Sequence, residues 1–328
     1  MSTFSYGRCA LLALGGLFAI SMQMPAQAAE DTYPTRPVRI VVPYAPAGVT
    51  DVMARVIADQ MSKSLGQPFV VENKAGAGGV VGMEAVYRSP HDGYTLVMMP
   101  ANLAILKVLY NRLSFDPIND FVPVANVGAS PVGIAVHPSL PVRSVPELVQ
   151  YVRAHPGLGY ASCGIASPQH LAGEYLRSVA EIDLNHIPYK GCGEAVTDVM
   201  AGRVKLFFAS IPHLIPYRAT EQLIAIGVTG ASESALLPEV PTVASAGYSG
   251  FNIEAWFGLL APKGTSPEIV RRLNDEVNKA LQSQVVLERM KQQNFAPVGG
   301  SAEAFKATIT ADVERLGGIA RRAGITTD

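Results

Sequence analysis

The sequence predicts an α/β fold with mainly parallel sheets. Short apolar runs rich in Val and Ile, such as residues 38–42, each precede a loop of small residues and then a helical pattern. This arrangement occurs in two successive sets, the second beginning near Val132, and a helical stretch follows. Strand, helix, strand order favours parallel sheets with right-handed crossovers, and two such sets favour two lobes with a ligand between them.

The first unit joins a strand to a helix through a tight loop. The apolar residues 38–42 predict a buried strand. Residues 43–50, which are Pro, Gly and mostly small residues, predict a turn, and the spacing of apolar residues from Asp51 onward predicts a helix. A helix N-terminus has unpaired N–H groups and a partial positive charge. The junction is therefore either an anion-binding loop or an ordinary turn in which Thr50 or Asp51 caps the helix.

Two further strands follow, at residues 69–71 and 94–98. A Gly-rich helix start succeeds the first of them, and a loop that contains Asn102 succeeds the second. The carboxyl ends of parallel strands meet at one edge of a sheet, where ligands bind in such folds. We therefore expect three loops to lie along one edge: 44–51, 73–79 and 99–103.

The second set repeats the pattern. Its predicted strands are at 132–136, 185–188, 204–208 and 223–228, and its predicted helices at 146–154 and 194–201, with another after Ser167. Ser167 is a plausible N-cap before Pro168. We expect irregular structure at residues 115–123 and a linker at residues 237–250. A strand at 256–260 and two helices, one beginning near Pro267 and the other spanning 305–319, complete the chain.

Composition excludes one class of partner. The 328 residues are 48% hydrophobic and 16% charged, with a formal net charge of -1. Nucleic-acid binding requires a basic surface, so we expect no nucleic-acid partner. The six histidines have no metal-binding spacing, and we expect no metal and no cofactor.

The N-terminus has the features of a signal peptide over residues 1–28. Arg8 precedes an apolar run, and Ala26-Gln27-Ala28 fits a cleavage site, so we expect cleavage after Ala28 and an exported protein. A retained anchor is the alternative. Export permits a disulfide between Cys163 and Cys192, worth roughly 3.5 kcal/mol in the chain-entropy model. The alternative is two separate thiols.

Several stretches together resemble one family. They are residues 33–43, Gly48-x-x-Asp51-x-x-Ala54-Arg55, residues 71–79, residues 92–96, Pro188-Tyr189-Lys190-Gly191 and residues 256–262. In order and spacing they are similar to the periplasmic solute receptors of tripartite tricarboxylate transporters, also called Bug or TctC receptors. The resemblance runs from about Tyr33 to the C-terminus.

The resemblance implies a two-lobed periplasmic binding protein of type II, a Venus flytrap, that is not an enzyme. Lobe 1 would comprise residues 29–127 plus 252–328, and lobe 2 residues 128–251. It also implies a small organic carboxylate in the cleft, delivery to the membrane permease subunits of the transporter, and a monomer in the periplasm. The expected ligand-binding residues are Ala47, Gly48, Val49, Thr50, Asp51, Asn102, Ser162, Gly164, Ser167, His170, Lys190, Gly191 and Ser210.

Two departures from the family bear on the ligand. The first loop reads Ala45-Pro46-Ala47-Gly48 where the family usually has Pro-Pro-Gly-Gly, so its shape is expected to differ. Ala209-Ser210 stands where the family often has Asp-Asn, which removes a partner for an amino group. This favours a simple mono- or dicarboxylate, aromatic acids included, over an amino acid.

The sequence leaves two interpretations open for the role of several side chains. Asp51 either touches ligand-bound water or orders the first loop, and His170 either donates to a carboxylate or only packs. Lys190 either pairs with a second carboxylate or is solvated, and Trp256 either lines the cleft or packs at the crossover. The alternative function is an exported hydrolase of a carboxylate ester, because Ser162 and Ser167 lie near His170 in the sequence. Against it, there is no G-x-S-x-G motif and no acid placed to orient the histidine.

Overall fold

The computed structural model describes residues 33–46, 48–110 and 112–325. The expected signal peptide and its cleavage site after Ala28 lie outside these residues. From Pro34 onward the chain forms one compact unit.

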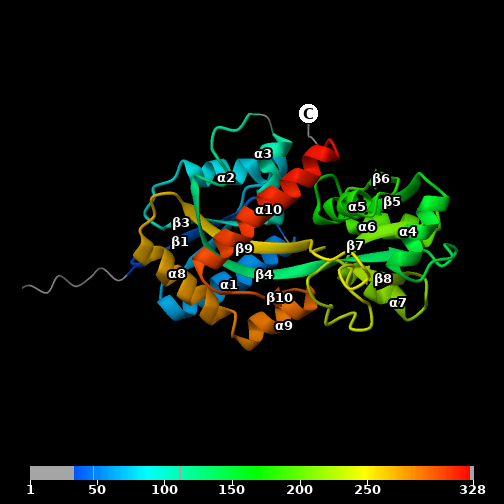
Figure 1. The fold of residues 1–328 in the computed structure, drawn as a ribbon. Coiled ribbons are helices and arrows are strands. Elements are labelled where there is room, and N and C mark those ends of the chain that lie inside the picture. The colour runs from blue at the N-terminus through cyan, green and yellow to red at the C-terminus, as the bar shows by residue number, and fades with distance from the viewer. Residues whose placement is uncertain (1–32, 47, 111, 326–328) are drawn as a thin grey trace, which may run out of the picture. The chain divides into compact units, whose positions relative to one another are not determined.

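The strands form one ten-stranded sheet in the order β2-β1-β3-β9-β4-β7-β5-β6, with β10 and β8 also paired to β4. We name the part from β2 to β4 with β10 the first sheet region, and the part from β4 to β6 with β8 the second sheet region. The strands are β1 (Val38–Val42), β2 (Phe69–Asn73), β3 (Thr95–Pro100), β4 (Phe121–Val136), β5 (Leu158–Ser162), β6 (Leu184–Pro188), β7 (Leu206–Ser210), β8 (Ile224–Val228), β9 (Glu254–Pro262) and β10 (Ala296–Pro297). In Figure 1 the elements of the second region, from α4 to β8, lie together on the right.

The helices cover both sheet regions. The α-helices are α1 (Val49–Leu65), α2 (Val80–Tyr87), α3 (Leu106–Leu109), α4 (Val145–Ala154), α5 (Pro168–Val179), α6 (Cys192–Met200), α7 (Ile215–Arg218), α8 (Pro267–Ala280), α9 (Gln284–Gln292) and α10 (Ala302–Arg322). The 3₁₀ helices are η1 (Ala77–Gly79), η2 (Ala101–Ile105) and η3 (Ile211–His213). Among the described helices, none combines the length and the apolar character that a membrane crossing requires.

The first sheet region begins as a parallel sheet. Strand β1 pairs in parallel with both β2 and β3, with Val38 opposite Phe69 and Arg39 opposite Thr95. Four of the five β1 residues are buried, as expected for a strand covered on both faces. Helix α1 packs through an apolar stripe that includes Met53, Ile57 and Met61. The carboxyl ends of β1, β2 and β3 therefore share one edge, as the sequence predicted.

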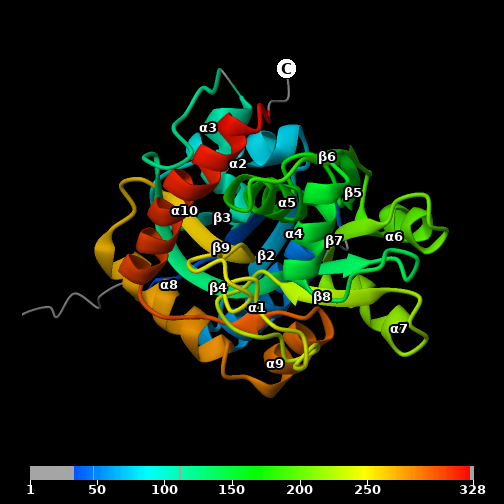
Figure 2. The same ribbon diagram turned by 45° about the vertical axis from the view of Figure 1, so that its right-hand side comes forward.

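The second sheet region has parallel pairs β5–β6 and β5–β7, and α5 and α6 follow the loops after β5 and β6. Ser144 and Ser167 cap α4 and α5 by accepting from the N–H groups of Glu147 and His170. The predicted cap at Ser167 is confirmed. Figure 2 shows α4 to α7 around β5–β8 in a turned view.

Strand β4 belongs to both regions. Its residues up to Pro131 pair with β9, and from Val132 onward they pair with β7. The prediction of irregular structure at 115–123 is wrong for residues 121–123, which already belong to this strand. Pro123 hid the strand in the sequence. It is tolerated because the register with β9 shifts between Pro123 and Ala125.

The cap of α1 also differs from the prediction. The helix begins at Val49, with Gly48 in an extended conformation at the N-cap and no side chain bonded to the cap. Thr50 and Asp51 lie inside the first turn, so neither is the cap. Helix α9 is a further element that the sequence pattern did not predict.

Candidate functional site

A cavity of about 600 Å³ opens at the shared strand edge, and we name it the edge cavity. Its lining comes from both sheet regions. The first wall consists of Tyr44, Gly78, Pro100, Asn102, Leu109 and Tyr110, and the second wall of Ile165, Ala166, Ser167 and Pro168. The first wall thus uses the loops after β1, β2 and β3, and the second wall uses the loop between β5 and α5. This volume lies within the range of about 300–1,000 Å³ that is typical of pockets for small organic ligands.

The first wall is held by a hydrogen-bond network of neutral groups. The Tyr44 hydroxyl lies 2.9 Å from Asn102 Oδ1 and 3.0 Å from the Gly78 carbonyl oxygen, and it donates to them. The Asn102 amide donates to the same Gly78 oxygen at 2.9 Å. Burial raises the pKa of Tyr44, so its hydroxyl keeps its proton. Gly78 has a φ of 59°, which suits glycine, and a Cβ at this position would lie 3.1 Å from the Tyr110 hydroxyl.

The described residues at the start of α1 are not in the cavity lining. Gly48 is exposed, Val49 is partly exposed, and Thr50 and Asp51 are buried. Asp51 accepts from Arg55 Nε at 3.0 Å and from Asn73 Nδ2 at 2.9 Å. Asn73 Nδ2 also donates to the Tyr44 carbonyl, so Asp51 orders the first loop. Ala47 lies outside the described residues.

The second wall is a tight loop between β5 and α5. Ser162 is fully buried, and its hydroxyl accepts from the Gly164 N–H at 3.2 Å. Ser167 lines the cavity, and its hydroxyl donates to the Gly164 carbonyl at 2.7 Å. Gly164 has a φ of 137° and Ala166 a φ of 60°. The internal bonds of the loop leave the Ile165 side chain 58% exposed at its tip.

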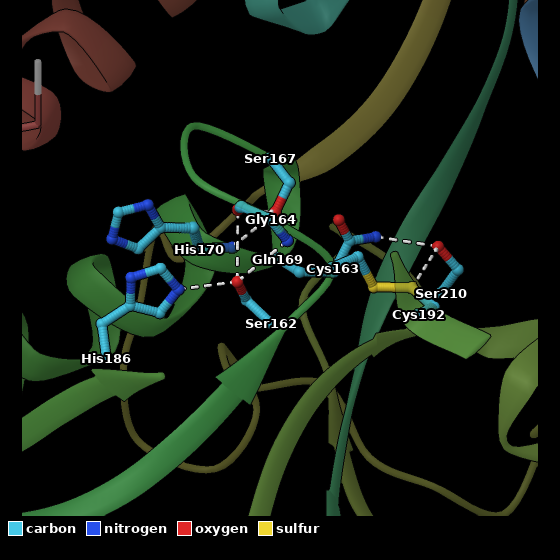
Figure 3. Close-up of a disulfide and its surroundings, with 9 residues drawn as sticks. All are labelled: Ser162, Cys163, Gly164, Ser167, Gln169, His170, His186, Cys192 and Ser210. Carbon is cyan, nitrogen blue, oxygen red and sulfur yellow. Dashed lines mark hydrogen bonds between the residues drawn. A yellow bond between two sulfur atoms is a disulfide. The ribbon is translucent and has the colours of Figure 1, made fainter. Parts of the chain in front are cut away.

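A pair of histidines supports this loop from inside the lobe. The rings of His170 and His186 stack with their centres 3.6 Å apart (Figure 3). His170 Nδ1 accepts from the Ala166 N–H at 3.1 Å. Burial and the nearby His186 and Arg177 lower the pKa of His170 to about 3, and burial lowers the pKa of His186 to about 4. His170 is therefore a neutral acceptor for the loop and is not in the cavity lining.

A disulfide joins Cys163 to Cys192 and ties this loop to the start of α6 (Figure 3). The two positions are separated by 29 in the sequence. Ser210 lies beside it, with its hydroxyl 3.6 Å from Cys192 Sγ, and accepts from Gln169 Nε2 at 2.8 Å. Ser210 thus links β7 to α5 and does not line the edge cavity.

Three other residues lie elsewhere. Lys190 is exposed, and its backbone N–H donates to Glu194 at 3.3 Å. Gly191 is the N-cap of α6. Trp256 is buried, and its indole N–H donates to Asp312 Oδ2 at 2.6 Å. Trp256 therefore packs at the crossover strand β9 against α10.

Of the residues expected to bind ligand, Asn102 and Ser167 line the edge cavity. The sequence predicted that three loops share this sheet edge, which the parallel pairing confirms, but it did not single out Tyr44, Gly78, Tyr110 or Ile165. Tyr44 and Gly78 lie in two of the three loops predicted to share the edge. An apolar side chain in a loop otherwise made of small residues was the signal that could have identified Ile165.

The geometry does not support a hydrolase. Ser162 Oγ lies 2.7 Å from His186 Nε2, but Ser162 is fully buried away from the cavity. Ser167 accepts from the backbone of His170, and the ring of His170 faces Ala166 instead. In the described part of the chain, no three His, Cys, Asp or Glu side chains gather where they could hold a metal ion.

Comparison with known proteins identifies the family of this chain. Residues 53–325 match the family model described as "Tripartite tricarboxylate transporter family receptor". The chain is 37% identical to Protein BugT of Bordetella pertussis over 96% of this chain and 97% of that protein.

Two solved structures also match. Rpa4515 of R. palustris with adipate has a TM-score of 0.75 at 33% identity and covers 89% of this chain and 99% of that one. MatC of Rhodopseudomonas palustris with bound malate has a TM-score of 0.70 at 30% identity and covers 88% and 99%. Proteins of this kind are two-lobed periplasmic receptors for solutes and not enzymes. This chain belongs to the tripartite tricarboxylate transporter family of receptors.

Proposed function

We propose that this protein binds a small organic carboxylate in the edge cavity and delivers it to the membrane permease of a tripartite transporter. The observation that carries the proposal is the edge cavity itself, which has walls from both sheet regions. A ligand that touches both walls favours the closed arrangement of a two-lobed receptor over the open one. Similar proteins with adipate and malate support a carboxylate ligand.

The carboxylate would bind at the first wall, next to the start of α1. That helix has 17 residues and no side chain bonded to its cap at Gly48, so Val49 and Thr50 would contribute partial positive charge beside the lining. Asn102 adds a side-chain amide in the cavity lining. Gly48, Val49 and Thr50 would act through their backbone N–H groups, and Asp51 through the order it gives the loop.

The lobes of this receptor would follow the sheet pairing. Residues 29–127 plus 252–328 would form lobe 1, and residues 128–251 lobe 2. Outside β4 the pairing supports this division, because β1, β2, β3, β9 and β10 belong to the first sheet region and β5 to β8 to the second. Within β4 the pairing changes from β9 to β7 between Pro131 and Val132, just beyond the proposed boundary at 127. We further propose that residues 1–28 are a signal peptide and that the mature receptor is a monomer in the periplasm.

The test is a ligand screen by thermal unfolding. The purified protein is unfolded and refolded to remove bound ligand, and its melting temperature is then measured with a panel of carboxylates, amines and nucleotides. An acid at a hundredfold excess over its Kd should stabilise the fold by about 2.7 kcal/mol, which corresponds to roughly 5 °C for a chain of this size. The acid should be recovered unchanged. Stabilisation by amines or nucleotides alone would contradict the carboxylate assignment, and turnover of an ester would contradict the receptor function.

A further inference from the structure

We propose that the edge cavity selects a monocarboxylate with an apolar, ring-sized body, and that Ile165 is the residue that makes this selection. The inference rests on the proposed function and narrows its ligand class. It follows from the separate positions of the polar and apolar groups in the cavity and from the partners of the nearby charges.

The polar end of the cavity lies at the first wall and is neutral. Asn102 uses one of its two amide N–H donors on Gly78, so a second donor remains. The Tyr110 hydroxyl has no hydrogen-bond partner among the described residues and lies beside the same glycine. Both residues line the cavity. Together they offer donors for one carboxylate group.

The rest of the lining is apolar. Leu109, Pro100 and Pro168 contribute side chains without polar atoms, and Ile165 extends from the opposite wall with 58% of its surface exposed. A large apolar side chain exposed at the tip of an internally bonded loop gains from covering the apolar face of a ligand. The N–H groups of Ala166, Ser167 and His170 already bond within the loop, so the second wall offers few donors.

No described lining residue is charged, and in the sequence Ala47 and Asn111 are uncharged as well. Two cations on adjacent segments have acidic partners, and two others, Arg112 and Lys190, are exposed and are not in the lining. Arg55 pairs with Asp51 at 2.9 Å, and Lys74 pairs with Glu72 at 3.2 Å. A second carboxylate would therefore be desolvated against apolar side chains without a counter-charge, and an amino group would lack an acid. This disfavours dicarboxylates and amino acids.

The test compares four acids by calorimetry on the ligand-free protein: benzoate, cyclohexanecarboxylate, adipate and malate. We expect both ring acids to bind at least about 10-fold more tightly than either dicarboxylate. Ile165→Ser should weaken benzoate binding by roughly 10-fold or more, because an apolar contact is lost. Ile165→Leu should keep the affinity within about threefold. Val285→Ser is the matched control, since Val285 is also exposed, at 59%, but lies on α9.

Each outcome decides the inference. Tighter binding of adipate or malate than of benzoate would overturn it and leave the proposed carboxylate receptor standing. Benzoate affinity unchanged in Ile165→Ser would overturn the selecting role of Ile165. If no acid binds and the melting temperature of the ligand-free protein is normal, both the inference and the carboxylate assignment fail. Ile165 is exposed, so the variant should fold, and an unchanged melting temperature without ligand checks this.

Discussion

The two walls of the edge cavity are built on opposite principles. The first wall presents neutral hydrogen-bonding groups, Tyr44 and Asn102 above all, at the ends of three parallel strands. The second wall presents Ile165 on a loop that a disulfide, a serine cap and a buried histidine hold in place. The first wall can recognise a charged group, and the second can cover an apolar one. Recognition in this receptor therefore depends on both walls meeting the same ligand.

The walls also differ in how their shape is maintained. The first wall takes its shape from the sheet, because its loops leave adjacent strands. The second wall follows one strand, β5, and needs additional bonds. Removing those bonds should change the second wall more than the first, and the predictions below test this difference.

The largest effect is expected from the disulfide. Replacing Cys163 and Cys192 with alanine should lower the free energy of unfolding by up to roughly 3.5 kcal/mol, because the unfolded chain loses the cross-link. Urea unfolding followed by circular dichroism measures this. The control is a dithiol reductant, which should destabilise the natural protein and leave the double variant unchanged. If neither treatment alters stability or ligand affinity, the second wall does not depend on this bond.

The next effect concerns the polar end. Asn102→Asp replaces an N–H donor with a negative charge that faces the ligand carboxylate, so affinity should fall at least about 100-fold. Calorimetry with the best acid of the panel measures it. Gln222→Glu adds the same charge at an exposed residue before β8 and should not change binding. An Asn102→Asp affinity within threefold of the natural one would place the carboxylate elsewhere.

The lowered pKa of His170 predicts that the folded protein loses stability in acid. The pKa of His170 is lowered to about 3 in the folded protein, against an ordinary value of 6.5. Between these pH values the unfolded chain binds a proton that the folded chain does not, so stability falls as pH falls from 6.5 toward 3. The slope is about 1 kcal/mol per pH unit.

Urea unfolding at several pH values measures this slope. His170→Asn keeps an acceptor for the Ala166 N–H and cannot titrate, so its stability should fall less steeply over the same range. Equal slopes in the two proteins would mean that His170 is protonated in the folded state.

The smallest effect is expected at Lys190. This exposed residue bonds Glu194 through its backbone and does not line the cavity. Lys190→Ala should change affinity less than twofold in a calorimetric titration with the best monocarboxylate. A loss of tenfold or more would show that the closed receptor brings this cation to the ligand. It would then favour a dicarboxylate and contradict the division of roles between the walls.

The order of strands and helices could be predicted because the apolar runs are short and the loops between them are rich in Gly and Pro. The long strand β4 could not, since Pro123 and Pro131 interrupt its pattern. Both prolines are tolerated through pairing with β9, which is more than a hundred residues away in the sequence. Helix α9 was missed because only Leu281, Gln282 and Ser283 separate it from the end of α8.

The site was predicted at the level of loops rather than side chains. Parallel strands place their carboxyl ends together, so the loop with Asn102 could be assigned to the edge. The role of His170 could not be predicted, because its ring accepts from the N–H of Ala166, and the positive φ of Ala166 is not signalled by the sequence. Lys190 lies before a Gly-rich helix start, and the first loop also lies before a helix start. The sequence therefore suggested a similar role for both, but the exposed side chain of Lys190 is not in the cavity lining.

Strand β4 has a further consequence for how this protein can vary. Pro131 is its last residue paired with β9, and Val132 is its first residue paired with β7, so no loop separates the two sheet regions along this strand. Side chains alternate between the faces of a strand, and one inserted residue reverses every face beyond it. A one-residue insertion near Pro131 would therefore turn the buried face of the second region outward. Surface loops tolerate changes in length more readily than a paired strand does, so the length of β4 is what keeps the two sheet regions in register.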